Sequence, residues 1–267
     1  MDLQLAIIVA LTFVIHLIGT LAYAFRIAGV RTGNIAIAFS LFNILVLVSR
    51  VSNSFQGPFL AKRVENTIHA PGMHDLAFDF ALVLAAASAA TLAGGLLIPT
   101  FQRYSTVAVE AFRRRRSVPL LMLRAATPRG LAVLSESVSM PRYANLRRLR
   151  FGGAVPAGVV VLNVIATALW TVGVLAAIYA GSLDPDFRVT AATLSSVING
   201  IATIALFLIV DPYLSGLTDD VVAGRASEAD FRRAVTWMVA SRLAGTLLAQ
   251  ALLFPSALLI VWVAGLL

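Results

Sequence analysis

The chain has 267 residues, of which 59% are hydrophobic and only 13% are charged, and its mean hydropathy is +0.89. Soluble domains carry about 25% charged residues, so this composition excludes an ordinary water-soluble domain and indicates a surface that faces mainly lipid. Cysteine is absent, which excludes disulfides, thiolate metal sites and cysteine nucleophiles. The formal charge of +8 comes almost wholly from arginine, and in a membrane protein basic residues indicate topology before they indicate nucleic-acid binding.

Six stretches are long and apolar enough to cross a bilayer, because a helix needs about 20 residues to span the hydrocarbon core. The sequence therefore predicts an all-α, polytopic membrane protein with a single transmembrane domain. The first stretch has neither a basic leader nor a small-residue cleavage site, so we expect a retained helix and not a signal peptide. We expect Asp211-Pro212 to end the fifth span. The predicted spans are residues 3–25, 34–60, 76–98, 154–179, 189–210 and 235–267.

The connection between the third and fourth spans, residues 101–151, holds eleven arginines against two acids. The positive-inside rule predicts that this connection is cytoplasmic. Alternation of the other loops then leaves sixteen basic residues inside and three outside, so both termini are predicted to face outward. Short apolar patches at 118–123 and 131–134 predict amphipathic helices on anionic membrane lipids. We see no internal repeat, and a three-plus-three inverted repeat is not expected.

A polar stripe on the second span contains the first candidate site residues. Arg50 shares a helix face with Asn43, Asn53 and Ser54, at spacings of three, four and seven residues. A charged side chain in hydrocarbon is costly and needs a partner or a function. The Arg50 guanidinium could bind a phosphate through two parallel hydrogen bonds. It could equally pair with Asp79 on the third span or extend to the membrane surface.

A second polar stripe lies on the sixth span, where Arg242, Thr246 and Gln250 follow one another at helical spacing. Arg242 lies about eight residues into the span, within its inner half. Two interpretations remain open for this arginine. It could contact an anionic substrate, or its long side chain could reach the cytoplasmic interface.

Histidine and aspartate suggest a possible proton relay or ion pair. His16 lies near the middle of the first span and could exchange protons near neutral pH, with Asp79 as a partner, or it could simply pack against its neighbours. His69 and His74 are five residues apart in a loop, which is weak evidence for a metal site. We therefore predict no bound metal.

The usual signatures of membrane-associated enzymes are missing. The sequence contains no G-x-x-x-x-G-K-[ST], H-E-x-x-H or G-x-S-x-G, so we expect no nucleotide hydrolysis, no catalytic residues of these types and no cofactor. Asp219-Asp220, followed by Gly224-Arg225, is weakly similar to the acidic motif of CDP-alcohol phosphotransferases. The further aspartates of that motif are lacking.

Three blocks of sequence resemble the Amj family of lipid II flippases, the alternates to MurJ. The blocks are residues 15–32, residues 41–44 with 50–58, and residues 211–212 with 218–220 and 242–250. The resemblance covers most of the chain. It implies a transporter of the bacterial cytoplasmic (inner) membrane that acts in peptidoglycan synthesis. Its substrate would be an undecaprenyl-pyrophosphate-linked precursor, which moves from the inner to the outer leaflet.

A substrate of this kind can keep its lipid tail in the membrane, so the protein needs only a cationic groove for the headgroup. We expect Arg26 and Arg31 at the inner mouth, Arg242 in the inner half and Arg50 in the outer half to form a graded series of anion sites. An inside-negative potential favours outward movement of an anion by roughly 2.3 kcal/mol per charge per 100 mV.

Three alternatives remain. The first is a proton- or ion-coupled exporter of a small solute, with His16 and Asp79 as the relay. The second is an intramembrane enzyme of lipid metabolism that uses Asp219 and Asp220. The third is a membrane scaffold whose small-residue-rich segment 85–95 packs against other helices.

Overall fold

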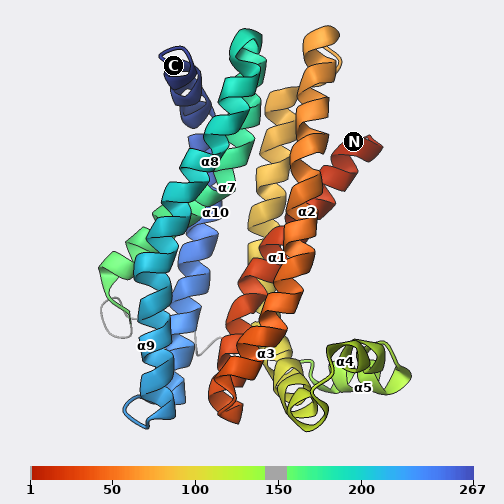
Figure 1. Ribbon diagram of the computed structural model, residues 1–267, viewed down its shortest axis with the longest axis vertical. Coiled ribbons are helices and arrows are strands. Elements are labelled where there is room, and N and C mark those ends of the chain that lie inside the picture. The colour runs from red at the N-terminus through yellow and green to blue at the C-terminus, as the bar shows by residue number, and fades with distance from the viewer. Residues whose placement is uncertain (1, 142–154) are drawn as a thin grey trace.

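The computed structural model describes residues 2–141 and 155–267, and in this part of the chain the protein is a bundle of long helices without β-strands (Figure 1). Six helices are long and apolar enough to cross a membrane, which confirms the predicted all-α architecture. These helices are α1 (Leu3–Thr32), α2 (Ile35–His69), α3 (Leu76–Arg115), α7 (Ala157–Leu183), the continuous helix Pro185–Val222, and α10 (Glu228–Ala264).

Side-chain caps fix where several helices begin. The Asp2 carboxylate accepts the N–H of Leu5 at 2.8 Å, and Asp75 caps α3 in the same way. Ser227 and Asp230 form a reciprocal capping box at the start of α10. These polar side chains satisfy N–H groups that no helical carbonyl can reach, so each helix starts at a defined residue.

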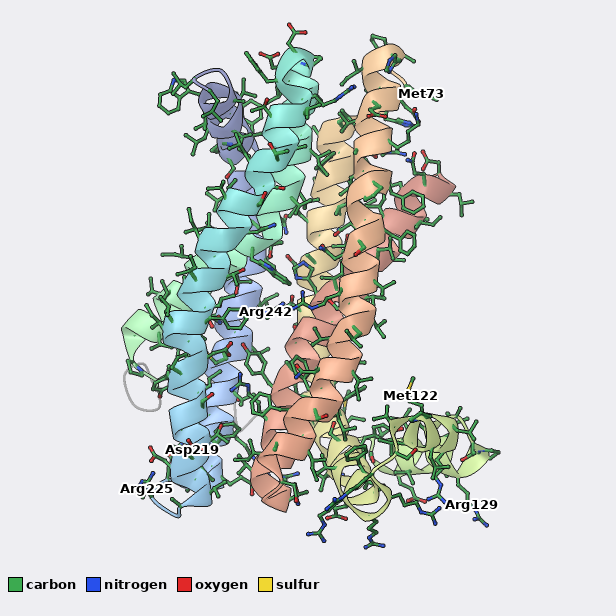
Figure 2. All side chains as sticks on the ribbon, in the orientation of Figure 1. Met73, Met122, Arg129, Asp219, Arg225 and Arg242 are labelled. Carbon is green, nitrogen blue, oxygen red and sulfur yellow. The ribbon has the colours of Figure 1, made fainter. Side chains whose placement is uncertain are left out.

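The third helix continues past the predicted span, which ends at residue 98, and leads into two short helices. α3 continues through Pro99 to Arg115, and α4 (Val118–Ala125) and α5 (Pro128–Glu136) follow it. Both short helices lie beside the end of the bundle, with Met122 and Leu123 exposed (Figures 1 and 2). Helices therefore do follow the third span, as predicted. The rest of the predicted connection, residues 142–151, and residue 154 lie outside the described residues.

The expected end of the fifth span at Asp211-Pro212 is wrong. The helix continues from α8 (Arg188–Ala205) through a π-helical turn, Leu206–Val210, into α9 (Asp211–Val222). Pro212 has no N–H, and its ring would clash with the carbonyl of residue 208 in a regular α-helix. The π-helical turn rearranges the hydrogen bonds just before the proline, so the chain keeps its direction instead of stopping.

The six long helices form two groups of three. The N-terminal trio is α1, α2 and α3, and the C-terminal trio is α7, the helix Pro185–Val222 and α10. In each trio the first helix packs along both others, which touch each other less. α1 and α3 run down the bundle in Figure 1, whereas α7 and α10 run up it. The structure thus contains the three-plus-three inverted arrangement that the sequence did not lead us to expect.

The two ends of the bundle differ in charge and in packing. Arginines gather at the end where α1, α3 and α9 finish, which we call the arginine-rich end, and Asp2, Asp75, Asp184 and Asp186 lie at the opposite end. In the half toward the opposite end, buried residues of both trios form one cluster that includes Leu84, Val172 and Leu253. The two trios are therefore packed tightly together away from the arginine-rich end.

Candidate functional site

A cavity of about 480 Å³ lies between α1, α3, α10 and residues 139–141, in the arginine-rich half of the molecule. Leu92 and Leu96 line it and are each 51% exposed at the bundle surface, so the cavity opens sideways between α3 and α10. Its volume is within the range of about 300–1,000 Å³ that is usual for small-molecule sites. Other lining residues used below are Arg31, Gly95, Ile98, Pro99, Gln102, Arg103, Arg232, Val235, Val239 and Leu243.

Three arginines, one from each helix, line the cavity at its arginine-rich end. The Glu228 carboxylate accepts hydrogen bonds from Arg31 Nε at 2.7 Å and from Arg232 Nη2 at 2.6 Å. Arg103 has no ion pair with any described residue. One carboxylate thus serves two guanidinium groups while a third is uncompensated, and this excess of positive charge suits an anion.

The other part of the cavity is apolar. Leu92, Leu96 and Leu243 line it toward the middle of the bundle. A Cβ at Gly95 would lie 2.8 Å from Cγ1 of Val239, so the glycine lets α10 come close to α3 at this level. A cavity that is basic at one end and apolar at the other fits an amphiphile with an anionic headgroup.

Arg242 forms a second feature near the middle of the bundle (Figure 2). Its side chain is buried, and its Nε and Nη2 atoms have no hydrogen-bond partner among the described residues. The guanidinium lies 5.7 Å from the ring centroid of Trp170, which is 6.1 Å from the ring of His16. A Cβ at Gly19 would lie 2.5 Å from Nη2 of Arg242, so this glycine makes room for the guanidinium. Arg242 does not line the cavity.

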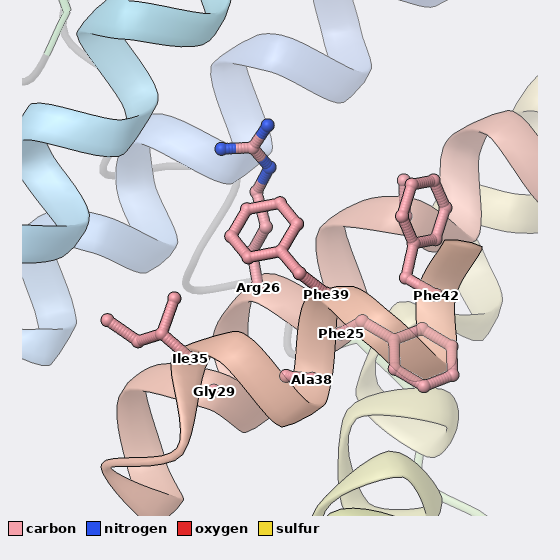
Figure 3. Close-up of a pocket in the computed structure, with 8 residues that line it drawn as sticks. Phe25, Arg26, Gly29, Ile35, Ala38, Phe39 and Phe42 are labelled. Carbon is pink, nitrogen blue, oxygen red and sulfur yellow. The ribbon is translucent and has the colours of Figure 1, made fainter. Parts of the chain in front are cut away.

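Arg26 is already paired. Its Nη2 atom donates to Asp211 at 2.7 Å, and its guanidinium lies 4.9 Å from the ring centroid of Phe39. Figure 3 shows Arg26 beside Phe39 at a void of about 10 Å³, which also touches Phe25 and Phe42. That volume holds about one water molecule, so it cannot hold a lipid headgroup. Arg26 links α1 to α9 in this structure.

Asp79 pairs with Arg63 and not with Arg50. Its Oδ2 atom accepts from Arg63 Nε at 2.6 Å, and the side chains are 6% and 4% exposed. Arg63 also binds Asp2, and the Leu5 N–H together with Arg63 lowers the pKa of the Asp2 carboxyl. The Arg50–Asp79 pair, which the sequence left open, does not form, because α2 extends beyond residue 60. Arg63 therefore stands level with the start of α3, and Arg50 lies about 20 Å further down α2.

The predicted candidates are only partly brought together. Arg31 lines the cavity, whereas Arg242 and His16 meet at the mid-bundle feature. Arg50 is exposed on α2 together with Asn43 and Asn53. Gln250, also exposed, donates to Ser88 Oγ at 3.3 Å.

Sequence reasoning missed Arg103 and Arg232, because it counted these two arginines only as markers of topology, and it had no reason to single out Gln102. One signal was available. Glu228 and Arg232 are four residues apart near the start of an apolar helix, a spacing that places both side chains on one helix face.

These features define a multi-pass membrane protein with a basic cavity that opens sideways between two long helices. Comparison with known proteins is more specific. The chain belongs to the Amj family, described as alternate to MurJ, and the match covers residues 11–264. It is 35% identical over 263 residues to the lipid II flippase Amj of Bacillus subtilis (strain 168), a match that covers 97% of this chain and 96% of that protein. No solved structure matches the chain.

Proposed function

We propose that this protein is a lipid II flippase of the bacterial inner membrane. It moves the undecaprenyl-pyrophosphate-linked precursor of peptidoglycan from the inner to the outer leaflet. The similar Bacillus subtilis protein carries that name. The observation that supports this function most directly is the cavity, in which three arginines adjoin an apolar opening between α3 and α10.

The arginine-rich end faces the cytoplasm in this proposal. Its support is the positive-inside rule, because Arg113, Arg114, Arg115, Arg225 and Arg233 all lie at that end of the bundle. Both chain termini then face outward. The exposed apolar side chains of α4 and α5 lie on the anionic inner leaflet, with their arginines toward the lipid headgroups.

The pyrophosphate binds at the basic end of the cavity. Arg103 offers a guanidinium that has no ion pair in the described part of the chain, and the phosphate oxygens replace the Glu228 carboxylate between Arg31 and Arg232. Two parallel N–H···O bonds from each guanidinium match the geometry of a phosphate. The isoprenoid tail leaves the cavity past Leu92 and Leu96 and stays in the lipid.

Arg242 is the next contact on the route across the membrane. Its two unpaired donors lie in the middle of the bundle, where a headgroup that has left the cavity still lacks water. Arg50, Asn43, Asn53 and Gln250 remain predicted contacts beyond it. We no longer include Arg26 among the anion sites, because Asp211 already neutralises its charge.

The exporter alternative has one supporting observation, the buried and unpartnered Nδ1 atom of His16. Its second relay group, Asp79, is held by Arg63. Because Asp2 also binds Arg63, and His16 lies fourteen residues further along α1, about 21 Å separates the histidine from that ion-pair network. The two residues do not form a continuous relay, which leaves the flippase as the function that the geometry supports better.

Rescue of a bacterium depleted of its own lipid II flippases tests the proposal. We expect the wild-type protein to restore growth and Arg103→Gln to fail while it accumulates normally, since it loses the free cation of the cavity. Arg113→Gln is the matched control, because it removes the same charge from the same helix outside the cavity and should rescue. Failure of the wild-type protein to rescue would contradict the function. Equal rescue by both variants would contradict the site.

A further inference from the structure

Each trio contains the same kind of glycine–threonine contact, and this contact shows which residues of the two trios correspond. A Cβ at Gly94 of α3 would lie 2.7 Å from Thr20 Cβ of α1, and a Cβ at Gly245 of α10 would lie 2.7 Å from Thr167 Cβ of α7. In both trios that Cβ would also lie close to the carbonyl oxygen of the residue three positions before the threonine, Leu17 or Val164. The first and third helices of each trio therefore meet in the same way.

Aligning the two trios on this contact reveals a sequence similarity that we did not find from the sequence alone. With Gly94 placed on Gly245, residues 92–97 read LAGGLL and residues 243–248 read LAGTLL, so five of six positions are identical. With Thr20 placed on Thr167, Ile-Gly-Thr at 18–20 matches Ile-Ala-Thr at 165–167. Each trio has three spans, so the two repeats cross the membrane in opposite directions, as their helices do in Figure 1.

The repeat relates the open cavity to a closed region in the other half of the molecule. Three cavity-lining residues of α3 and α10 have counterparts that are packed together in the buried cluster of the opposite half. These pairs are Ile98 with Ala249, Gln102 with Leu253, and Val235 with Leu84. The same two helices thus line a cavity at one end and are packed in a buried cluster at the other.

A hydrogen bond joins α3 and α10 in the packed half of the molecule. Pro99 and Val239 line the cavity, and their counterparts are Gln250 and Ser88. Gln250 Nε2 donates to Ser88 Oγ at 3.3 Å, which joins α10 to α3 at the level where the repeat would place a second opening.

We infer that the packed outer halves of α3 and α10, held by Ser88 and Gln250, form a latent exit site for the lipid headgroup that opens when the cytoplasmic cavity closes. This inference rests on the proposed function for the identity of the cargo. The inverted repeat provides two equivalent packings of α3 against α10, of which the structure displays one. Exchange between them moves the opening from one leaflet to the other.

The exit site differs from the cavity in its chemistry. The counterparts of the three cavity arginines are Ala81, Ile178 and Phe254. These counterpart positions therefore supply no guanidinium to retain a pyrophosphate at the outer opening, and Ser88 and Gln250 supply only neutral hydrogen bonds. The headgroup is held on the cytoplasmic side and released on the other.

Single cysteines test the opening, because the chain has none of its own. Leu84 and Val83 are both 0% exposed. Their counterparts, Val235 and Ala234, are 3% and 0% exposed, but only Val235 lines the cavity. In spheroplasts that carry either variant, a membrane-impermeant maleimide should label Leu84→Cys about tenfold faster than Val83→Cys, since only residue 84 faces the exit site in a minor open state.

A cross-link tests the Ser88–Gln250 contact. In Ser88→Cys/Gln250→Cys, a short bis-methanethiosulfonate reagent should lower lipid II translocation at least tenfold below that of the same variant without reagent, and a reductant should return it to that level. In the same background, the bridge should protect Leu84→Cys from the maleimide. Thr12→Cys/Gln56→Cys is the matched control, because these side chains are hydrogen-bonded within one trio, and its bridge should leave transport intact.

Equal labelling of Leu84→Cys and Val83→Cys, or normal transport by the bridged Ser88/Gln250 variant, would overturn the inference. The labelling of Leu84→Cys and its protection by the bridge do not depend on the cargo. If the labelling and its protection are as expected but the wild-type protein does not rescue flippase-depleted cells, the proposed function is wrong and the moving opening stands. If rescue succeeds and the outer bridge has no effect, the proposed function stands and the moving opening is wrong.

Discussion

Gly19 leaves the space that the Arg242 guanidinium occupies, and we predict that a single added methyl group abolishes transport. In Gly19→Ala the new Cβ would stand 2.5 Å from Nη2, so the guanidinium must leave its position over Trp170. Rescue of flippase-depleted cells should be lost at normal protein levels. Gly158→Ala, where a Cβ meets nothing within 4 Å, should rescue fully. Full rescue by Gly19→Ala would show that the position of Arg242 does not matter.

The Arg63–Asp79 pair should stabilise the fold and not contribute to transport. Because both side chains are nearly inaccessible, Asp79→Asn leaves the buried Arg63 guanidinium with the Asp2 carboxylate alone, a loss of at most about 3–5 kcal/mol. Thermal unfolding of the purified protein in detergent should show a clearly lower midpoint. Arg50→Gln should leave that midpoint unchanged, since Arg50 is exposed and does not contact Asp79. A shared midpoint for the two variants would argue for the alternative pair of Arg50 with Asp79.

Between the helices, we predict that substitution of Gly94 and of Gly245 lowers the stability of the protein by similar amounts. Gly94→Ala and Gly245→Ala each push a methyl group against a threonine of the neighbouring helix, and overpacking of this kind costs about 1–3 kcal/mol. Gly216→Ala, in an open part of α9, should be neutral or slightly stabilising. Thermal midpoints in detergent measure all three. A large difference between Gly94→Ala and Gly245→Ala would contradict the equivalence of the two trios.

Most helices could be predicted from the sequence, since apolar length alone identifies a span. Their ends could not. The expected stop at Asp211-Pro212 assumed that proline breaks a helix, and the π-helical turn before it removes that conflict. The end predicted at residue 60 followed the change to polar residues, but α2 continues because Arg63 finds two carboxylates. In both cases contacts or hydrogen bonds outside the local pattern decided the outcome.

For the whole molecule, we predict transport driven by the membrane potential without a nucleotide. A pyrophosphate that crosses the full field outward gains roughly 2.3 kcal/mol per charge at 100 mV, inside negative. In proteoliposomes with the arginine-rich end inside, a valinomycin-imposed potential of that sign should accelerate lipid II translocation, and the reversed potential should slow it. Vesicles that contain the Arg103→Gln variant serve as the control. Rates that do not respond to the sign would mean that the headgroup crosses as a neutral species.

The candidate site could be predicted only in its chemistry. The sequence predicted arginines as the recognising groups. In the described residues Arg31 lines the cavity, and Nε and Nη2 of the buried Arg242 have no hydrogen-bond partner. Which arginines meet depends on how three helices far apart in the sequence come together. Arg26 and Arg31 are five residues apart, yet one faces Asp211 and the other faces the cavity. No pattern within α1 distinguishes them.

The lack of guanidinium groups at the counterpart positions Ala81, Ile178 and Phe254 bears on how fast each half of the cycle runs. A passive carrier cannot alter the equilibrium between the leaflets, so its asymmetry must appear in rates alone. Loading from the inner leaflet is assisted by attraction, whereas recapture from the outer leaflet is not. We expect the empty carrier to be mostly in the conformation that is open to the cytoplasm. Consumption of the precursor outside then makes net transport outward.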